Sequence, residues 1–182
     1  MKDALLLVDV LSDFGHDDGE RLARAFAERL PALAALIADA RERGLPVIYA
    51  NDHLGDWTAD RESLVERARR AAPSGRSIES ILPARGDPLV IKPRYSAFDH
   101  TAVQLLLAEL ETERILLAGC ALEMCVAQTA IDARELGLKV SVVVDACAPL
   151  DPDHAEVALR YLDRVVGAVL VGADAWADNS AA

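Results

Sequence analysis

Short runs of apolar residues alternate with longer amphipathic segments along this sequence. The short runs are rich in leucine and β-branched residues and are almost continuously apolar, which is typical of parallel strands covered on both faces. They predict six strands, at residues 4–9, 46–51, 89–92, 114–119, 139–145 and 168–172. The alternation with amphipathic segments indicates repeated β–α units around one sheet.

The amphipathic segments predict the helices between these strands. Apolar positions at helical spacing over residues 33–40 indicate a helix that has Pro31 in its first turn and stops at Gly44. A second helix over residues 123–136 is expected to end at Gly137, which serves as its C-terminal cap.

Polar residues mark the starts of two further helices. Thr101 and Gln104 have the spacing of a capping box, and Asp151 followed by Pro152 opens another helix. No repeat, low-complexity segment or linker interrupts the sequence, so residues 1–182 are expected to form a single domain. The predicted fold class is α/β. We expect a three-layer α/β/α, doubly wound, Rossmann-like domain with a six-stranded, mainly parallel sheet in the order 3-2-1-4-5-6.

The connection between the second and third strands, residues 52–87, is long for a compact domain. Only short helical pieces are expected within it, near residues 62–71 and 77–82. A connection of this length usually has a function. It fits a wall or lid of the site and a contact between subunits equally well.

Composition limits the classes of partner. The net charge of -11 and the pI of about 4.7, with basic residues scattered along the chain, argue against nucleic acid as a partner. No apolar run is long enough to span a bilayer and no signal peptide is recognisable, so we expect a cytoplasmic protein without a membrane partner. Three cysteines fit a reducing compartment better than a disulfide scaffold.

Three residues with chemically active side chains follow predicted strands. Asp9 ends the first strand, Lys92 ends the third, and Cys125 follows the fourth. Ligands of open α/β sheets bind beyond the carboxyl ends of the strands, where an aspartate can act as a base and a lysine can supply a point charge. Position alone also fits an Asp9 that caps a loop and a Lys92 that reaches solvent at the rim.

Cys125 is a candidate nucleophile because it lies near the start of a predicted helix. Backbone N–H groups at a helix start lower the pKa of a thiol and can bind an oxyanion. The alternative is a small buried apolar residue, the commonest fate of a free cysteine. That interpretation is assigned to Cys120 and Cys147. Cys120 and Cys125 are too far apart in sequence for a Cys-x-x-Cys redox pair, and the cysteine spacing matches no metal site.

Five segments together resemble one known family. They are, in order, "LLLVDVLSDF", "VIYAND", "VIKPRYSAF", "LLAGCALEMCVAQTAIDARELG" and "VSVVVDACA". In order and spacing they are similar to the isochorismatase-like cysteine hydrolases, which include nicotinamidases, N-carbamoylsarcosine amidohydrolase and other small-amide hydrolases. The resemblance covers nearly the whole chain.

The resemblance implies a role for each residue of the site. Asp9 would be the base that takes the thiol proton, Lys92 would balance the charge beside it, and Cys125 would be the nucleophile. The family also implies a cis peptide bond between Cys120 and Ala121, which would aim the N–H groups of Ala121 and Cys125 at a developing oxyanion.

Departures from the family pattern limit what carries over. Nicotinamidases begin a metal site with Asp-x-His, whereas this chain reads Asp52-His53-Leu54 with no second histidine nearby. No metal and no cofactor are therefore expected. Leu122 replaces a threonine that is frequent in the family turn. Isochorismatases proper often lack the cysteine, so its presence favours amide chemistry.

Four further residues are candidates for binding the substrate. Phe14 shortly follows Asp9 and corresponds to a substrate-facing position in the family, or else it is a core aromatic residue. Trp57 in the long connection could stack on a substrate or on a partner subunit. Arg94 and Tyr95, just beyond Lys92, could recognise a carboxylate or carbonyl group, although Arg94 also suits a rim salt bridge.

Asp13 and Glu123 are interpreted as structural. For Glu123, a helix start favours an acidic residue.

The sequence therefore predicts a metal-independent cysteine amidohydrolase. It would cleave the C–N bond of a small amide or ureido compound through a thioacyl-enzyme intermediate. The alternatives are an isochorismatase-type vinyl ether hydrolase and a catalytically idle member of the family that acts as a binding subunit. The expected partners are a small-molecule substrate and further copies of the chain, in a homodimer or homotetramer.

Overall fold

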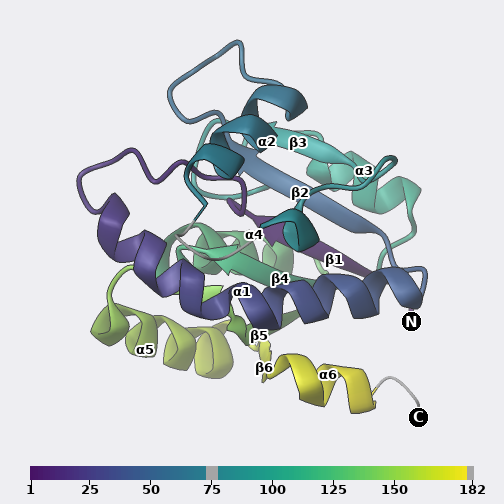
Figure 1. Cartoon of the computed structure of the whole chain (residues 1–182). Helices are drawn as coiled ribbons and strands as arrows, with labels where there is room; N and C mark the ends of the chain where they lie inside the picture. The colour runs from purple at the N-terminus through teal and green to yellow at the C-terminus, as the bar shows by residue number, and fades with distance from the viewer. Residues whose placement is uncertain (73–77, 180–182) are drawn as a thin grey trace.

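The structure is a computed structural model, and it describes residues 1–72 and 78–179. The described residues form a parallel sheet of six strands in the order β3-β2-β1-β4-β5-β6 (Figure 1). The strands are β1 (Asp3–Val8), β2 (Val47–Asp52), β3 (Leu89–Lys92), β4 (Arg114–Cys120), β5 (Lys139–Ala148) and β6 (Val169–Val171). All five strand pairs are parallel, and the strand order confirms the predicted fold class.

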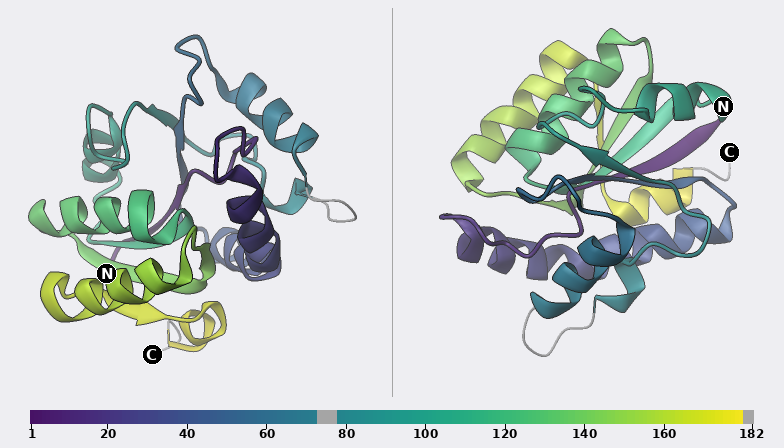
Figure 2. Two further views of the ribbon diagram at one scale, coloured as in Figure 1. Left: turned by 90° about the vertical axis from the view of Figure 1, so that its left-hand side faces the viewer. Right: turned by 90° about the horizontal axis from the view of Figure 1, so that it is seen from above.

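Helices cover both faces of this sheet. The helices of the described chain are α1 (Gly19–Glu42), α2 (Arg61–Arg70), α3 (Val103–Glu109), α4 (Ala127–Glu135), α5 (Pro152–Tyr161) and α6 (Ala173–Asn179). Short helical turns add η1 (Glu79–Ile81), η2 (Leu122–Val126) and η3 (Leu162–Val166). Figure 2 shows α3, α4 and α5 on one side of the sheet, with α1 and α6 on the other. Because both faces are covered, the central strands are almost entirely apolar and buried.

The first helix is longer than the sequence pattern predicted. It begins at Gly19, not near Pro31, and Pro31 lies inside it on the exposed side. The reason is that Leu22, Phe26 and Leu30 continue the buried apolar stripe upstream at a spacing of four residues. Packing of this stripe on the sheet outweighs the loss of one backbone hydrogen bond at the proline.

The other predicted helix boundaries agree except for one cap. Asp151 caps α5 by accepting hydrogen bonds from the amides of Asp153 and His154. The capping box predicted for Thr101 and Gln104 is wrong, because α3 begins at Val103 and its N-cap residue is Ala102. The Thr101 hydroxyl instead donates to the carbonyl of Ala97 and accepts from the Val103 amide.

The long connection between β2 and β3 contains the two short helical pieces that were expected, α2 and η1. Ser77, the first residue of the second predicted piece, lies outside the described residues. None of the described helices is long and apolar enough to cross a membrane.

Candidate active site

A cavity of about 490 Å³ opens at the carboxyl ends of the central strands. Its walls come from the loop after β1, the segment after β2 and the turn after β4. Asp9 and Cys125 both line it, and so do Leu54 and Gly55 of the long connection. That connection therefore forms a wall of the cavity. The volume is in the range of small-molecule sites in other proteins.

Asp9 directly follows β1 and has a positive φ of 52°. Its amide donates to the Ala50 carbonyl at 3.0 Å, and its Oδ1 accepts a 2.7 Å hydrogen bond from the Asp52 amide. Its backbone carbonyl accepts a hydrogen bond from the Cys120 thiol at 3.1 Å. β2 thus holds the carboxylate of Asp9, and both neighbouring strands hold its backbone at the end of the sheet.

Lys92 ends β3 and has no exposed surface. Its Nζ lies 2.8 Å from Oδ2 of Asp9, donates to the Arg94 carbonyl at 2.9 Å and lies 3.7 Å from the sulfur of Cys125. A buried ammonium group is tolerated when it is paired and hydrogen-bonded in this way. The structure therefore brings the three predicted residues together around one ammonium group.

Cys125 lies in the helical turn η2, which leads from β4 directly into α4. Cys125 is partly exposed, and its sulfur accepts a 3.7 Å hydrogen bond from Nζ of Lys92. Its backbone carbonyl accepts a 2.7 Å hydrogen bond from the Thr129 hydroxyl. The peptide bond between Cys120 and Ala121, just before this turn, is cis, as the resemblance implied.

The pKa values of the site are shifted by burial. Burial raises the pKa of Asp9, although the charge of Lys92 opposes the shift. Burial and the carboxylate of Asp9 raise the pKa of Cys125 to about 12, so the expected lowering by the helix start is overridden. Burial opposes the charge of Lys92, but the neighbouring Asp9 and Cys125 outweigh it and the pKa of Lys92 is raised. The resting site therefore holds a neutral thiol next to the pair formed by Asp9 and Lys92.

The four candidate substrate-binding residues lie in different places. Tyr95 lines the cavity. The ring of Phe14 packs against Phe26 of α1 at 5.4 Å and is not among the described residues that line the cavity. The side chain of Arg94 forms an ion pair with Asp99 at 3.5 Å in a neighbouring groove, while its carbonyl binds Lys92.

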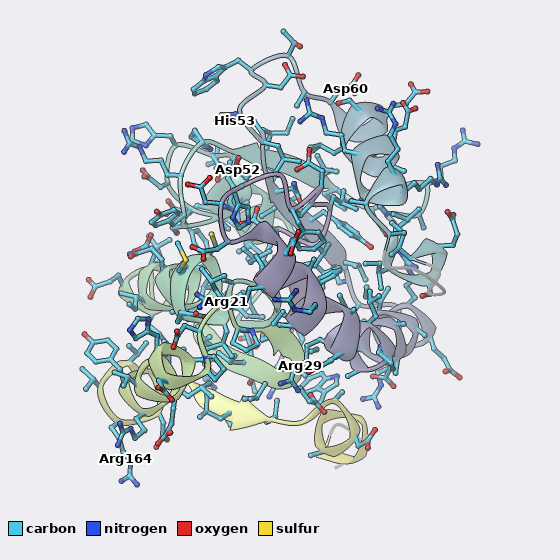
Figure 3. All side chains as sticks on the ribbon, turned by 60° about the vertical axis from the view of Figure 1, so that its left-hand side comes forward. Arg21, Arg29, Asp52, His53, Asp60 and Arg164 are labelled. Atoms are coloured by element: carbon cyan, nitrogen blue, oxygen red, sulfur yellow. The ribbon has the colours of Figure 1, made fainter. Side chains whose placement is uncertain are left out.

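Trp57 is 81% exposed and stacks on His53 with ring centroids 4.4 Å apart. It does not line the cavity within the described part of the chain. Figure 3 shows Asp52, the last residue of β2, and His53, which follows it, with Arg21 on α1 below them. Among residues 1–72 and 78–179, no group of three or more His, Cys, Asp or Glu side chains is arranged to hold a metal ion.

Asp13 and Glu123, which were interpreted as structural, both accept hydrogen bonds from backbone amides. Asp13 Oδ1 accepts from the Gly15 amide at 3.0 Å. The carboxylate of Glu123 accepts from the amides of Leu150 at 3.2 Å and Asp151 at 2.5 Å. Because Leu150 lines the cavity, Glu123 fixes one of its walls.

Sequence reasoning missed two polar residues that support the site, Asn51 and Thr129. Asn51 is 1% exposed; its side chain donates to the Leu11 carbonyl at 3.0 Å and accepts from the Leu11 amide at 2.9 Å. It thereby fixes the loop after Asp9. A single polar side chain at the end of an apolar strand was the available signal.

The chain belongs to the isochorismatase family, because the isochorismatase domain matches residues 3–174. It is 35% identical to the isochorismatase family protein YaaI of Bacillus subtilis, over 90% of each chain. It is 26% identical to maleamate amidohydrolase of Pseudomonas putida, over 96% of this chain and 85% of the relative. The crystal structure of N-carbamoylsarcosine amidase from Thermoplasma acidophilum is similar, with a TM-score of 0.72, 28% identity and coverage of 96% and 98% of the two chains.

Proposed function

We propose that this protein is a cysteine hydrolase that cleaves the C–N bond of a small amide or ureido compound. The observation that carries the proposal is the position of the Lys92 ammonium, 2.8 Å from Asp9 and 3.7 Å from the Cys125 sulfur, at the edge of a cavity. Two relatives with amidase names support the choice of a C–N bond.

In the first half of the proposed reaction, the Cys125 sulfur attacks the carbonyl carbon while its proton passes to Asp9. The raised pKa of Cys125, about 12, means that the thiol carries its proton until the substrate is bound. The C–N bond then breaks, and Asp9 returns the proton to the leaving nitrogen. The product of this half is a thioester on Cys125 and a free amine or ammonia.

In the second half, water attacks the thioester and Asp9 accepts a proton from that water. The C–S bond breaks, the acid leaves, and the sulfur regains its proton. Lys92 stays charged in both halves and balances the carboxylate when Asp9 is ionised. These steps use only groups that belong to this chain.

The proposed oxyanion site consists of the backbone N–H groups of Ala121 and Cys125. The amides of Met124 and Val126 donate to the Ala121 carbonyl at 3.1 and 3.2 Å. Ala121 lies between β4 and η2, and within the described part of the chain no backbone acceptor outside the helices and strands is found for its amide. This amide is therefore available to a substrate oxygen, and we propose that the Cys125 amide at the start of the helical segment acts with it.

The test is ammonia release from a panel of primary amides and ureides. The wild-type protein is expected to turn over at least one member, and Cys125→Ala is expected to abolish the activity. Cys147→Ala is the matched control, because Cys147 is a fully buried thiol of β5 whose sulfur lies 3.8 Å from the Leu117 carbonyl and outside the cavity.

Two outcomes would contradict the proposal. The first is that the protein releases product from a vinyl ether and that Cys125→Ala retains this activity, which would favour the isochorismatase-type reaction. Iodoacetamide labelling of Cys125 at the rate of a free thiol, unchanged in Asp9→Asn, together with no amide turnover, would favour a catalytically idle binding protein.

A further inference from the structure

The cavity in front of Cys125 has a strongly one-sided charge. Among the described residues that line it, four are aspartates and none is a lysine or an arginine. The four are Asp9, Asp13, Asp18 and Asp52. One histidine, His16, also lines the cavity. A group bound in the cavity therefore meets carboxylates from the loop after β1 and from the end of β2.

The cations nearest to these carboxylates are already paired. Lys92 has no exposed surface and is held by Asp9. Arg67 lies 3.5 Å from Asp13, 3.1 Å from Asp56 and 3.5 Å from the Leu54 carbonyl. These ion pairs hold each cation outside or beneath the cavity.

Two further arginines near the site are engaged as well. Arg21 of α1, labelled in Figure 3, lies 3.9 Å from Asp18 and 3.8 Å from Asp151. The Arg94 side chain forms an ion pair with Asp99 and lines the neighbouring groove. Neither guanidinium group lines the cavity within the described chain.

We propose that this cavity selects substrates without an anionic group, namely neutral or cationic amides and ureides. A substrate carboxylate would lose water on entry and would meet Asp13, Asp18 and Asp52 without a cation to pair with, which is unfavourable. A neutral amide avoids this penalty, and an ammonium group on the substrate would gain from the same carboxylates. The inference rests on the proposed function, since it names the substrate class of that site.

The test uses two reagents of nearly equal size that differ in charge, iodoacetamide and iodoacetate. Their rates of alkylation at Cys125 are measured by peptide mass spectrometry and are divided by their rates with a neutral free thiol, N-acetylcysteinamide, at the same pH. Iodoacetate is expected to be disfavoured at Cys125 by about tenfold relative to the free thiol, the effect of one like charge at short range. Raising the salt concentration should reduce this factor.

Matched variants assign the effect to the cavity. The double variant Asp13→Asn with Asp18→Asn keeps the side-chain shapes and is expected to lower the discrimination against iodoacetate by about threefold or more. Asp163→Asn is the control, because it removes a similar charge from η3, outside the cavity. The control is expected to leave the discrimination unchanged.

The proposal is overturned if iodoacetate reacts as well at Cys125, relative to iodoacetamide, as it does with the free thiol. It is also overturned if the double variant behaves like Asp163→Asn. Alkylation needs no turnover, so the ratio can be measured even if every amide in the panel is left intact. In that case the proposed function is contradicted, while the alkylation ratio still shows whether the cavity disfavours an anionic group.

Discussion

The Thr129 hydroxyl donates a hydrogen bond of 2.7 Å to the carbonyl oxygen of Cys125. The same hydroxyl accepts a 3.0 Å hydrogen bond from the amide of Ala97, and Thr129 has no exposed surface. One buried side chain of α4 therefore connects the turn that carries the thiol to the segment that follows Lys92. The two groups that it bonds to, the Cys125 carbonyl and the Ala97 amide, are backbone groups. Removal of the hydroxyl therefore leaves each of them without this hydrogen bond.

Thr129→Val is expected to destabilise the protein by about 1–3 kcal/mol, because it keeps the shape of the side chain but leaves buried polar groups unsatisfied. Urea unfolding measures this change. The rate constant of ammonia release should fall more than the Michaelis constant rises, because the thiol turn loses its position. Thr129→Ser, which keeps the hydroxyl, should retain more of both properties. Equal stability of the wild-type and valine proteins would contradict this assignment.

Lys92→Met is expected to remove activity and to cost about 3–5 kcal/mol of stability, since it leaves the buried carboxylate of Asp9 without its countercharge. The variant raises the pKa of Asp9 in the folded state further above its ordinary value. The loss of stability should therefore grow as the pH rises through the pKa of Asp9 and shrink in acid, where Asp9 is protonated in both states.

Unfolding of Lys92→Met is compared with that of Lys2→Met across this pH range. Lys2 is an exposed lysine that forms an ion pair with Glu111, so its replacement should have little effect. If the two variants lose the same stability at neutral pH, then the Asp9–Lys92 pair does not have the energetic role that its burial indicates.

The sequence contained enough information to place Asp9, Lys92 and Cys125 together. Each residue ends or follows an apolar run, and the carboxyl ends of parallel strands lie along one edge of a sheet. A correct assignment of strands and of their order therefore fixed the neighbourhood of all three side chains. The six strands were recognisable because their apolar runs are short and are separated by turn residues.

Features that depend on packing between distant segments could not be found in this way. Thr129 lies inside a predicted helix, and nothing in its local sequence shows that its hydroxyl reaches the segment after β3. Phe14 follows Asp9 closely in the sequence. Because α1 starts earlier than predicted, Phe26 lies beside Phe14 and the two rings pack against each other. The pKa of Cys125 was also misjudged, because burial of the thiol beside Asp9 is a property of the folded site.

The pH dependence of ammonia release should have one limb in acid. The proposed first step needs Asp9 ionised and Cys125 protonated, and burial raises the pKa of Asp9 above its ordinary value of 3.8. Activity on a neutral amide is therefore expected to rise with pH through an apparent pKa above 3.8. No further change from thiol ionisation is expected near pH 9, because the pKa of Cys125 is about 12.

This profile is measured as kcat/KM for an amide without titratable groups, with Asp163→Asn as the control. Asp163 lies in η3 and outside the cavity, so its replacement should preserve the acid limb. An increase in activity centred near pH 9 would indicate that a thiolate formed without Asp9 is the reactive species, and would contradict the proposed role of Asp9.

Gly119 is expected to be intolerant of any side chain. Its φ is 129°, and a Cβ atom there would lie 2.0 Å from the backbone carbonyl oxygen of Val8. Gly44 also has a positive φ, 70°, but a Cβ atom there meets nothing within 4 Å. Gly44→Ala should therefore cost about 1–2 kcal/mol from backbone strain alone, whereas Gly119→Ala must also push β4 away from β1. Such a shift would move Cys120, whose thiol bonds to the Asp9 carbonyl. We expect Gly119→Ala to lose far more stability in urea than Gly44→Ala and to lose ammonia release; equal losses would show that the close contact of β1 and β4 is not required.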